Sequence, residues 1–418
     1  MWTGCLPPPS DCSPRASRVA NEAETLAHMQ LALIRQRFNP FGGAERFIER
    51  AIAALEREGV EVTLIARAWR GANTRRTMIV DPSYAGRLWR DASFARGVRA
   101  LLGRERFDLV QSHERIPGCD LYRAGDGVHR QWLDNRAREA SFLERLGIRL
   151  NPYHWYTCAA EKAMFEHPAL RAVICNSKMI AAEVGRHFTI AAEKLHVIYN
   201  GVDLEHFHPS HRTAMRAMAR REIGCNTNDK VFAFVGSGFA RKGLGSAIDA
   251  LAASRREDFR LVIAGSDRAA SRFEDHARRV GVAGRVHFLG GREDVRPVYS
   301  AADCFILPTR YDPFPNAALE ALAMGLPVIV SDQCGAAELV RPGCNGWVCK
   351  PDRADELSRL MIEAAGAAGE RLSRESRSSV EGFGIARMAD RMIELYMMLL
   401  GRDAIHASAG TREGRNER

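Results

Sequence analysis

Two adjacent basic side chains stand in a glycine-rich loop of this 418-residue chain, where they can meet a phosphate. Arg241 and Lys242 belong to the stretch GSGFARKGL, residues 236–244, which follows an apolar run. Paired cations suit a diphosphate leaving group, because negative charge builds up on it as its bond breaks. The alternative is a solvated basic loop, and the other loops of the chain favour the first interpretation.

The same loop matches a dinucleotide-binding fingerprint only in part. Arg241 stands where the G-x-G-x-x-G pattern needs a small third residue. The next apolar run ends in AGSD, residues 264–267, without an acid at the usual distance of about 20 residues. We therefore disfavour an enzyme that transfers hydride.

The most specific pattern is TRYDPFPNAALEALAMGLPVIVSD, residues 309–332. Pro313 and Pro315 favour an extended loop, because each ring restricts φ at its own position and the conformation of the residue before it. Asn316 is expected to cap a helix that begins near Ala317. The loop then aims free backbone N–H groups at a ligand.

Two carboxylates of this segment, Asp312 and Glu320, lie eight positions apart, one before the predicted helix and one within it. A carboxylate can accept two hydrogen bonds from a ribose diol. The alternative for Glu320 is a surface acid. Its neighbours Leu319, Ala321 and Leu322 are apolar, however, and a carboxylate buried without a partner is costly. We therefore expect Glu320 to be functional.

A third loop, NPFGGAER at 39–46, carries Gly42 and Gly43 before a predicted helix. Without side chains, their N–H groups can approach an anion at the helix N-terminus. The alternative is a plain tight turn.

Three polar residues of the first half of the chain are further candidates for contact with a sugar. Asp126 is the leading candidate because Gly125 and Gly127 flank it, which suits a loop close to a sugar. His113 and His129 stand behind it. A turn aspartate and satisfied core histidines are the alternatives.

Apolar runs and helix-like segments alternate from Gln30 onward, which is typical of parallel sheets built from βαβ units. Residues 43–58 predict a helix with Phe47, Ile48, Ala51, Ile52 and Leu55 on one face. The predicted strands are 30–35, 60–66, 108–112, 172–175, 196–198, 231–236, 261–264, 286–289, 304–307 and 328–330.

The fold class that follows is α/β, with two doubly wound, Rossmann-like parallel-sheet domains facing across a cleft. A hinge is expected near 200–209, where the sequence is turn-rich. The expected parts are an extension or mis-assigned start at 1–28, a first domain at 29–202, a second domain at 203–383, a helix at 384–400 crossing back to the first domain, and a disordered tail at 401–418.

The composition is that of an ordinary globular protein, with 46% hydrophobic and 27% charged residues and a net charge of +9. The ten cysteines are scattered and form no C-x-x-C pair, so we expect neither zinc nor thioredoxin chemistry, and a reduced, cytosolic protein. No nucleic-acid-binding module is recognisable, so nucleic acid is not an expected partner.

These segments together resemble retaining glycosyltransferases of family four, which have the glycosyltransferase-B fold. The stretch ERIPGCDLYRAGDGVHRQWL at 114–133 and the GSGFARKG loop are most similar to lipopolysaccharide core α-1,3-glucosyltransferases. The E-x7-E motif of the family matches Asp312 and Glu320, with Asp in place of the first Glu. The resembling segments are NPFGGAERF, VICNSKMIAAEV, VIYNGVDLEHFHP, GSGFARKGL, AGSD, VHFLGGREDV and YDPFPNAALEALAMGLPVIVS.

The resemblance implies a role for each candidate. Arg241 and Lys242 would supply positive charge, and Glu320 would hold the donor ribose. The implied catalytic set is Asp126, Arg241, Lys242 and Asp312, and the implied acceptor side, in the first domain, is Asp126 with His113 and His129. The implied donor-binding set is Gly42, Gly43, Arg241, Lys242, Arg292, Phe314, Pro315, Asn316, Ala317 and Glu320.

The resemblance also implies a reaction. A hexose, glucose from UDP-glucose, would pass with retention of configuration to a lipid-linked glycan such as the lipopolysaccharide core. The departing phosphate would take the acceptor proton, with no cofactor and no metal. The alternatives are a nucleotide-sugar epimerase on the same fold, another glycolipid or exopolysaccharide acceptor, and a catalytically silent binder.

Basic and aromatic residues interleave between 130 and 156, a pattern that suits an anionic membrane surface. We therefore expect a cytoplasmic protein, peripherally attached to the inner face of the cytoplasmic membrane. A solvated helix over a normal core is the alternative. The residues are Arg130, Trp132, Arg136, Arg138, Phe142, Leu143, Arg145, Leu146, Arg149, Tyr153, Trp155 and Tyr156.

Overall fold

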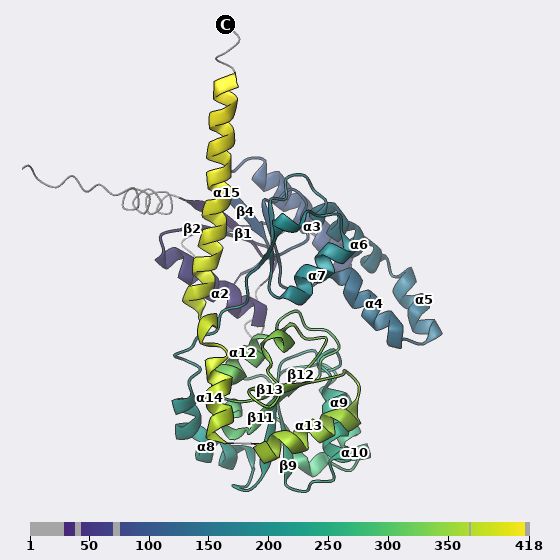
Figure 1. Cartoon of the computed structure of the whole chain (residues 1–418). Coiled ribbons are helices and arrows are strands. Elements are labelled where there is room, and N and C mark those ends of the chain that lie inside the picture. Colours follow the sequence, from purple (N-terminus) through teal and green to yellow (C-terminus); the bar gives the residue numbers. More distant parts are fainter. Residues whose placement is uncertain (1–28, 38–42, 70–75, 368, 414–418) are drawn as a thin grey trace, which may run out of the picture.

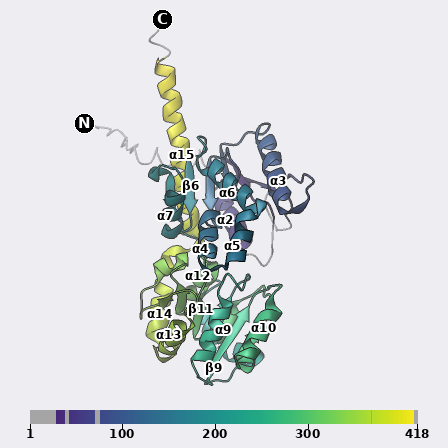
Figure 2. The ribbon, with the colours of Figure 1, turned by 90° about the vertical axis from the view of Figure 1, so that its right-hand side faces the viewer.

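Two parallel sheets form the centres of two domains in the computed structural model, which describes residues 29–37, 43–69, 76–367 and 369–413. Figures 1 and 2 show the domains end to end, with the last helix running from their junction along the first domain. The predicted extension at 1–28 and Gly42 lie outside the described residues.

The first sheet has seven strands in the order β3-β2-β1-β4-β5-β6-β7, all paired in parallel. The chain moves outward from β1 in one direction, then returns to β4 on its other side. The strands are β1 (Gln30–Ile34), β2 (Glu61–Ala66), β3 (Arg76–Ile79), β4 (Leu109–Ser112), β5 (Leu121–Ala124), β6 (Ala172–Cys175) and β7 (Leu195–Val197).

The second sheet has six parallel strands in the order β10-β9-β8-β11-β12-β13. Its order reverses between β8 and β11, as the first reverses between β1 and β4. The predicted fold class of two doubly wound α/β domains is therefore confirmed. The strands are β8 (Lys230–Val235), β9 (Phe259–Ala264), β10 (Val286–Phe288), β11 (Cys304–Leu307), β12 (Val328–Ser331) and β13 (Gly346–Cys349).

Helices cover the faces of both sheets, which is why β6, β11 and β12 are buried at every position. In the first domain they are α2 (Gly43–Arg57), α3 (Gly86–Leu102), α4 (His129–Glu139), α5 (Phe142–Leu150), α6 (Pro152–Phe165), α7 (Lys178–His187) and the short η1 (Ala192–Lys194). In the second they are α8 (Pro209–Ile223), α9 (Leu244–Ala253), α10 (Ala270–Arg279), η2 (Ala283–Arg285), α11 (Arg296–Ala301), α12 (Asn316–Ala323), η3 (Gly335–Leu339), α13 (Ala354–Ala367), α14 (Glu370–Ser378) and η4 (Glu381–Phe383).

Three strands were not predicted. β3 is an edge strand without a buried position, and β13 is short and begins with glycine. β5 carries the buried Arg123 in the middle of its apolar residues. β3 and β13 carry only short apolar segments, and a charged residue interrupts that of β5, so the pattern did not mark them as strands.

The last helix, α15 (Ile385–Glu413), packs on the first domain although it follows the second. Met388, Met392, Leu395 and Leu399 lie in the same core cluster as Ile48 of α2 and the strands beside it. These positions recur every three to four residues and so share one helix face. The helix is described as far as Glu413, and the disordered tail expected at 401–418 stays a prediction.

Two segments that lie side by side, at 201–202 and 383–385, connect the domains. The backbone N–H of Val202 donates to the carbonyl of Phe383 at 2.8 Å. A side chain at Gly201 would place its Cβ 2.7 Å from Ile385 Cα. The chain therefore leaves the first domain and returns to it along one narrow connection.

Candidate functional site

A cavity of about 810 Å³ lies between the domains and is lined by loops from both sheets. In doubly wound sheets, ligands bind at the carboxyl ends of the strands, where the strand order reverses. Both reversals, beside β1 and β4 and beside β8 and β11, send loops into this cavity. The predicted residues that line it are His113, Asp126, His129, Arg241, Lys242, Asp312, Phe314, Pro315, Asn316, Ala317 and Glu320.

Three predicted donor-binding residues are not among these lining residues. Gly42 is outside the described residues, and Gly43 begins α2. Arg292 is exposed in the loop after β10. Donor binding by these three stays a prediction.

Arg241 and Lys242 meet the carboxylate of Asp312 on the second-domain wall. Lys242 Nζ lies 3.2 Å and Arg241 Nη1 3.4 Å from Asp312 Oδ2. Burial by itself raises the pKa of Asp312. The positive charges of Lys242 and then of Arg241 together lower it by more, so the pKa lies below its ordinary value. The three charges therefore form one ionised group with a net positive charge, turned toward the cavity.

A glycine allows this group to form. Gly243 follows Lys242 with a φ of +78°, and a Cβ there would lie 2.0 Å from the carbonyl oxygen of Pro308. The loop after β8 therefore touches the end of β11 only because this position has no side chain. That contact holds Arg241 beside Asp312.

The segment Phe314–Ala317 presents the start of α12 to the cavity. The helix begins at Asn316, and its N-cap residue is Pro315, so the predicted capping role of Asn316 is wrong. Asn316 Oδ1 instead accepts a hydrogen bond from Asn200 Nδ2 at 2.7 Å, and the same amide group donates to the Phe314 carbonyl at 3.1 Å. The connection between the domains thus holds the segment Phe314–Ala317 in place.

Glu320 lies on the first turns of α12 with only 7% of its surface exposed, and it lines the cavity. Tyr299 of α11 donates its hydroxyl to Glu320 Oε2 at 3.0 Å. This bond orients the carboxylate, and its other oxygen stays available to a ligand hydroxyl. The expectation that Glu320 is not a plain surface acid agrees with this burial.

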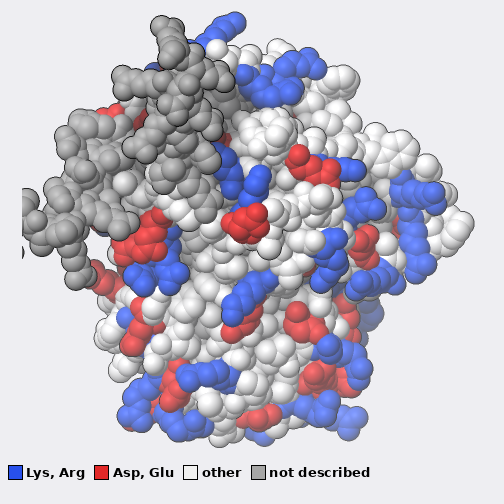
Figure 3. Space-filling view, turned by 45° about the horizontal axis from the view of Figure 1, so that its top comes forward, with Lys and Arg blue, Asp and Glu red and all other residues white. Residues whose placement is uncertain are grey.

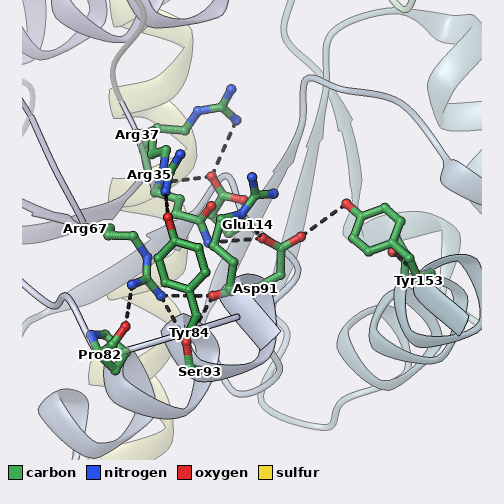
Figure 4. A network of polar contacts seen from close by, with 12 residues as sticks. Arg35, Arg37, Arg67, Pro82, Tyr84, Asp91, Ser93, Glu114 and Tyr153 are labelled. Atoms are coloured by element: carbon green, nitrogen blue, oxygen red, sulfur yellow. Dashed lines mark hydrogen bonds and ion pairs between the residues drawn. The ribbon is translucent and has the colours of Figure 1, made fainter. Parts of the chain in front are cut away.

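Asp126 lies on the opposite wall, in the loop after β5. Arg35 Nη1 donates to Asp126 Oδ2 at 3.2 Å and lies 3.7 Å from Glu114 Oε1 (Figure 4). Burial raises the pKa of Asp126, but Arg35 and Arg115 lower it to below its ordinary value. Asp126 is therefore a carboxylate at neutral pH and can accept a hydrogen bond from a sugar hydroxyl.

His113 follows β4 and is nearly buried, with 7% of its surface exposed. Its Nε2 lies 3.1 Å from Gln111 Nε2, and Gln111 Oε1 accepts the hydroxyl of Tyr396 at 2.7 Å. Burial, followed by Arg123 and Arg35, holds the pKa of His113 well below its ordinary value. His113 is thus a neutral imidazole whose orientation depends on α15.

His129 begins α4, and its Nε2 lies 3.1 Å from Nδ1 of His154 on α6. Burial, followed by Arg115 and His154, lowers the pKa of His129 to about 3. The ring is therefore neutral, and it belongs to an aromatic group with Trp132 and Tyr153.

Several site residues were not predicted. Arg35 directly follows β1, which is a signal that sequence alone offered. Glu161 of α6 is fully buried, binds Arg115 at 2.9 Å and accepts the backbone N–H of His129 at 2.7 Å. A carboxylate at the N-terminus of α4 is favourable there. No local pattern in the sequence marks Glu161.

Tyr311 links the domains beside the cavity. Its hydroxyl donates to Glu183 of α7 at 2.6 Å and accepts the backbone N–H of Val128 at 3.0 Å. Gly127 has a φ of +76°, and a Cβ there would lie 2.3 Å from the Tyr311 hydroxyl oxygen. The interface therefore closes on a buried carboxyl group.

This carboxyl group should make stability depend on pH. Burial raises the pKa of Glu183 from 4.5 to about 7, against the smaller lowering effects of Tyr311 and Arg186. The folded protein then holds a proton that the unfolded chain has released, so the stabilisation is complete below pH 4.5 and is lost as pH rises through 7. Its size is at most on the order of 3 kcal/mol.

The test is the melting temperature of the wild type and of Glu183→Gln near pH 5.5 and near pH 8. The amide still accepts the Tyr311 hydroxyl, so the variant should gain on the wild type at the higher pH. Glu166→Gln, at the exposed C-cap residue that follows α6, is the matched control and should show no such gain. An equal difference between wild type and Glu183→Gln at both pH values would contradict the assignment.

No metal-binding group of three His, Cys, Asp or Glu side chains occurs in the described ranges of the chain. Likewise, none of the described helices combines the length and the apolar character needed to cross a membrane. The eight described cysteines are all free.

Comparison with known families matches both halves of the chain. The profile of "Glycosyltransferase Family 4" matches residues 41–206, and that of "Glycosyl transferases group 1" matches residues 215–372. The chain is 27% identical over 343 residues to the lipopolysaccharide glucosyltransferase WaaG of Escherichia coli K12, covering 80% of this chain and 89% of WaaG. It is 26% identical over 369 residues to the lipopolysaccharide core biosynthesis glycosyltransferase LpsE of Rhizobium meliloti, covering 86% and 96%.

Two solved structures are similar in fold. The crystal structure of WaaG superposes with a TM-score of 0.77 at 24% identity, covering 88% of this chain and 99% of that chain. Anabaena HepE in complex with UDP-glucose superposes with a TM-score of 0.68 at 21% identity, with the same coverage.

Proposed function

Because this chain belongs to glycosyltransferase family 4, we propose that it transfers a hexose from a nucleotide diphosphate sugar to a glycan of the cell envelope. The observation that supports this most is the pairing of two features in one cavity. Arg241 and Lys242 offer positive charge to a diphosphate, and the buried Glu320 offers an oriented carboxylate to a ribose. Both come from loops of the second domain.

The donor that we propose is UDP-glucose. The Escherichia coli relative is a lipopolysaccharide glucosyltransferase by name, and HepE was solved with UDP-glucose bound. In this chain the diphosphate would lie beside Lys242, and the sugar would lie against Phe314–Ala317. The N-terminus of α12 favours negative charge at that place.

The mechanism that we propose retains the anomeric configuration. The bond between C1 of the sugar and the diphosphate oxygen breaks, and the acceptor hydroxyl oxygen bonds to C1 on the same face. The acceptor proton passes to the departing phosphate oxygen. Asp126 orients the hydroxyl, while Arg241 and Lys242 stabilise the negative charge that a metal ion would otherwise neutralise.

The acceptor that we propose is a lipid-linked glycan of the lipopolysaccharide core type, on the strength of the names of WaaG and LpsE. Both of these relatives are glycosyltransferases, so the epimerase alternative gains no support from them. An acceptor of another glycolipid or an exopolysaccharide would use the same cavity.

A donor-hydrolysis screen tests this function. The purified chain is incubated with UDP-, ADP- and GDP-sugars in the presence of EDTA, and the released nucleoside diphosphate is measured. We expect slow release from UDP-glucose by the wild type. At a donor concentration below the wild-type KM, the Glu320→Ala variant should release at least tenfold less, because the lost hydrogen bond weakens donor binding. Absence of release, together with absence of a thermal shift with any of the nucleotides, would overturn the proposal.

We also propose that the protein acts at the inner face of the cytoplasmic membrane. Helix α5 would provide the surface that contacts the lipid. Phe142 and Leu143 are 79% and 77% exposed, and no residue of α5 is buried. Figure 1 shows α5 projecting from the first domain beside α4, and Figure 3 shows basic side chains gathered on that side of the molecule. Apolar side chains framed by basic ones suit an anionic lipid surface.

Vesicle flotation tests this attachment. We expect the chain to float with vesicles that contain phosphatidylglycerol, and Phe142→Ser with Leu143→Ser to weaken binding at least tenfold, because each buried apolar side chain contributes about 1.5–3 kcal/mol. Ile362→Ser, an exposed apolar residue of the second domain, is the matched control. Flotation that is absent in the wild type, or unchanged in the double variant, would contradict the prediction.

A further inference from the structure

The predicted basic–aromatic stretch divides into two surfaces. Phe142, Leu143 and Trp155 face solvent, whereas Trp132 and Arg136 of α4 line the cavity. The cavity-lining part joins Tyr153 and His154 of α6 and Arg87 of α3. We call the group of Arg87, His129, Trp132, Arg136, Tyr153 and His154 the cationic–aromatic wall.

Two guanidinium groups of this wall are held by aromatic rings rather than by carboxylates. Arg87 Cζ lies 4.8 Å from the centre of the Tyr153 ring, and Arg136 Cζ lies 5.5 Å from that of Trp132. Within the described residues, neither arginine is in an ion pair. Stacking uses the face of a guanidinium and leaves its N–H donors free, so both groups are prepared for an anion.

The rings themselves are fixed. Tyr153 donates its hydroxyl to Asp91 Oδ2 at 3.1 Å, as Figure 4 shows. The ring centre of His129 lies 5.3 Å from that of Trp132 and 5.1 Å from that of His154. The wall is therefore a contiguous surface, and a ligand need not order it.

Arg87 and Arg136 both lie close to the His154 ring. After burial, Arg136 and Arg87 are the causes that lower the pKa of His154, so both cations lie near this ring. His129 and His154 are therefore neutral and can exchange hydrogen bonds with hydroxyl groups, while the positive charge resides on the two arginines. Sugar hydroxyls between two guanidinium groups match this arrangement.

The other cations that line the cavity already have partners, and Arg123 among them donates to Asn200 Oδ1 at 2.8 Å. Arg35 pairs with Asp126 and Glu114, and Arg115 pairs with the buried Glu161. Arg241 and Lys242 share Asp312 on the second-domain wall, where the proposed donor diphosphate would lie. The positive charges of Arg87 and Arg136 are thus available to the second substrate, the acceptor.

We propose that the cationic–aromatic wall is the acceptor subsite and that it binds an anionic sugar, one that carries a phosphate or a carboxylate. The inference rests on the proposed transferase function, because it assigns the acceptor of that same cavity. Guanidinium groups bind both anions in a bidentate manner, so the shared chemistry is a sugar with an anionic substituent.

Isothermal titration of the full chain, with and without saturating UDP, tests the subsite. The probes are glucose 6-phosphate, glucuronate and glucose. We expect at least one anionic sugar to bind roughly tenfold more tightly than glucose, which is the gain from one charge-assisted hydrogen bond. The preference between phosphate and carboxylate identifies the substituent. Equal binding of all three sugars would overturn the proposal.

The variants Arg87→Gln and Arg136→Gln should each abolish the preference for the anionic sugar. Arg96→Gln on α3 and Arg138→Gln on α4, which are exposed and outside the cavity, are the matched controls and should retain it. Binding of glucose 6-phosphate that survives both wall substitutions, and is displaced by UDP, would place the anion in the donor site and overturn the proposal.

Donor hydrolysis separates this inference from the function on which it rests. The control variants Arg96→Gln and Arg138→Gln, which lie outside the cavity, should release UDP from UDP-glucose at the wild-type rate. A wild type that binds the anionic sugar but releases no nucleotide would contradict the transferase function alone. A wild type that hydrolyses the donor without preferring an anionic sugar would contradict the acceptor subsite alone.

Discussion

Lys242→Ala should lower kcat on the proposed donor by about 100- to 1000-fold and leave the donor KM nearly unchanged. Lys242 lies 3.2 Å from Asp312, and its ammonium group is mostly buried at the cavity wall. Its charge matters most when the diphosphate departs, because negative charge is then greatest. Steady-state donor hydrolysis, with nucleoside diphosphate as readout, measures both constants.

Arg310→Gln is the matched control for this variant. Arg310 is a cation of the loop after β11, but it pairs with Asp352 and is not among the residues that line the cavity. It should keep the wild-type kcat. If Lys242→Ala lowers kcat by less than fivefold, or if Arg310→Gln lowers it equally, Lys242 does not stabilise the leaving group as proposed.

Glu320→Ala should instead act on donor binding. A hydrogen bond to a charged group contributes about 1.5–3 kcal/mol, so the donor KM should rise roughly 10- to 150-fold. The ribose hydroxyls lie far from the reacting bond and stay uncharged throughout the reaction. Their contact with Glu320 is therefore equally strong in the ground state and the transition state, and kcat should change much less. Donor titrations by hydrolysis rate and by calorimetry with UDP provide the measurement.

Tyr299→Phe separates the carboxylate from its orientation. This variant loses the 3.0 Å bond to Glu320 Oε2 but keeps the carboxylate. It should raise KM less than Glu320→Ala does, with an unchanged kcat. If Glu320→Ala and Lys242→Ala produce the same small changes in both constants, the division between binding and turnover is wrong.

Much of the fold could be predicted because doubly wound sheets bury their strands on both faces. Strands such as Cys304–Leu307 and Ala172–Cys175 are therefore continuous apolar runs with boundaries visible in the sequence. β5 was missed because its buried Arg123 breaks the run and bonds to Asn200 at 2.8 Å. A partner 77 positions away leaves no trace in a local pattern.

The candidate site could be predicted in part for a related reason. Loops after parallel strands gather at one edge of the sheet, so Arg241, Asp312 and Asp126 were all expected near a cleft. Their ion pairs were not foreseen. Asp312 meets Lys242 across 70 positions, and Arg35 meets Asp126 across 91.

The sequence by itself therefore determined the α/β class, the two sheets and the loops that carry charge, because hydrophobic periodicity and turn residues act over a few neighbouring positions. Only the tertiary structure decided which charges pair, which buried carboxyl group meets Tyr311, and which half of the basic–aromatic stretch faces the cavity. Those outcomes depend on how helices α4, α5 and α6 turn relative to one another and on how the two domains meet. Electrostatic contacts of that kind depend on distance in space, and separation along the chain does not encode it.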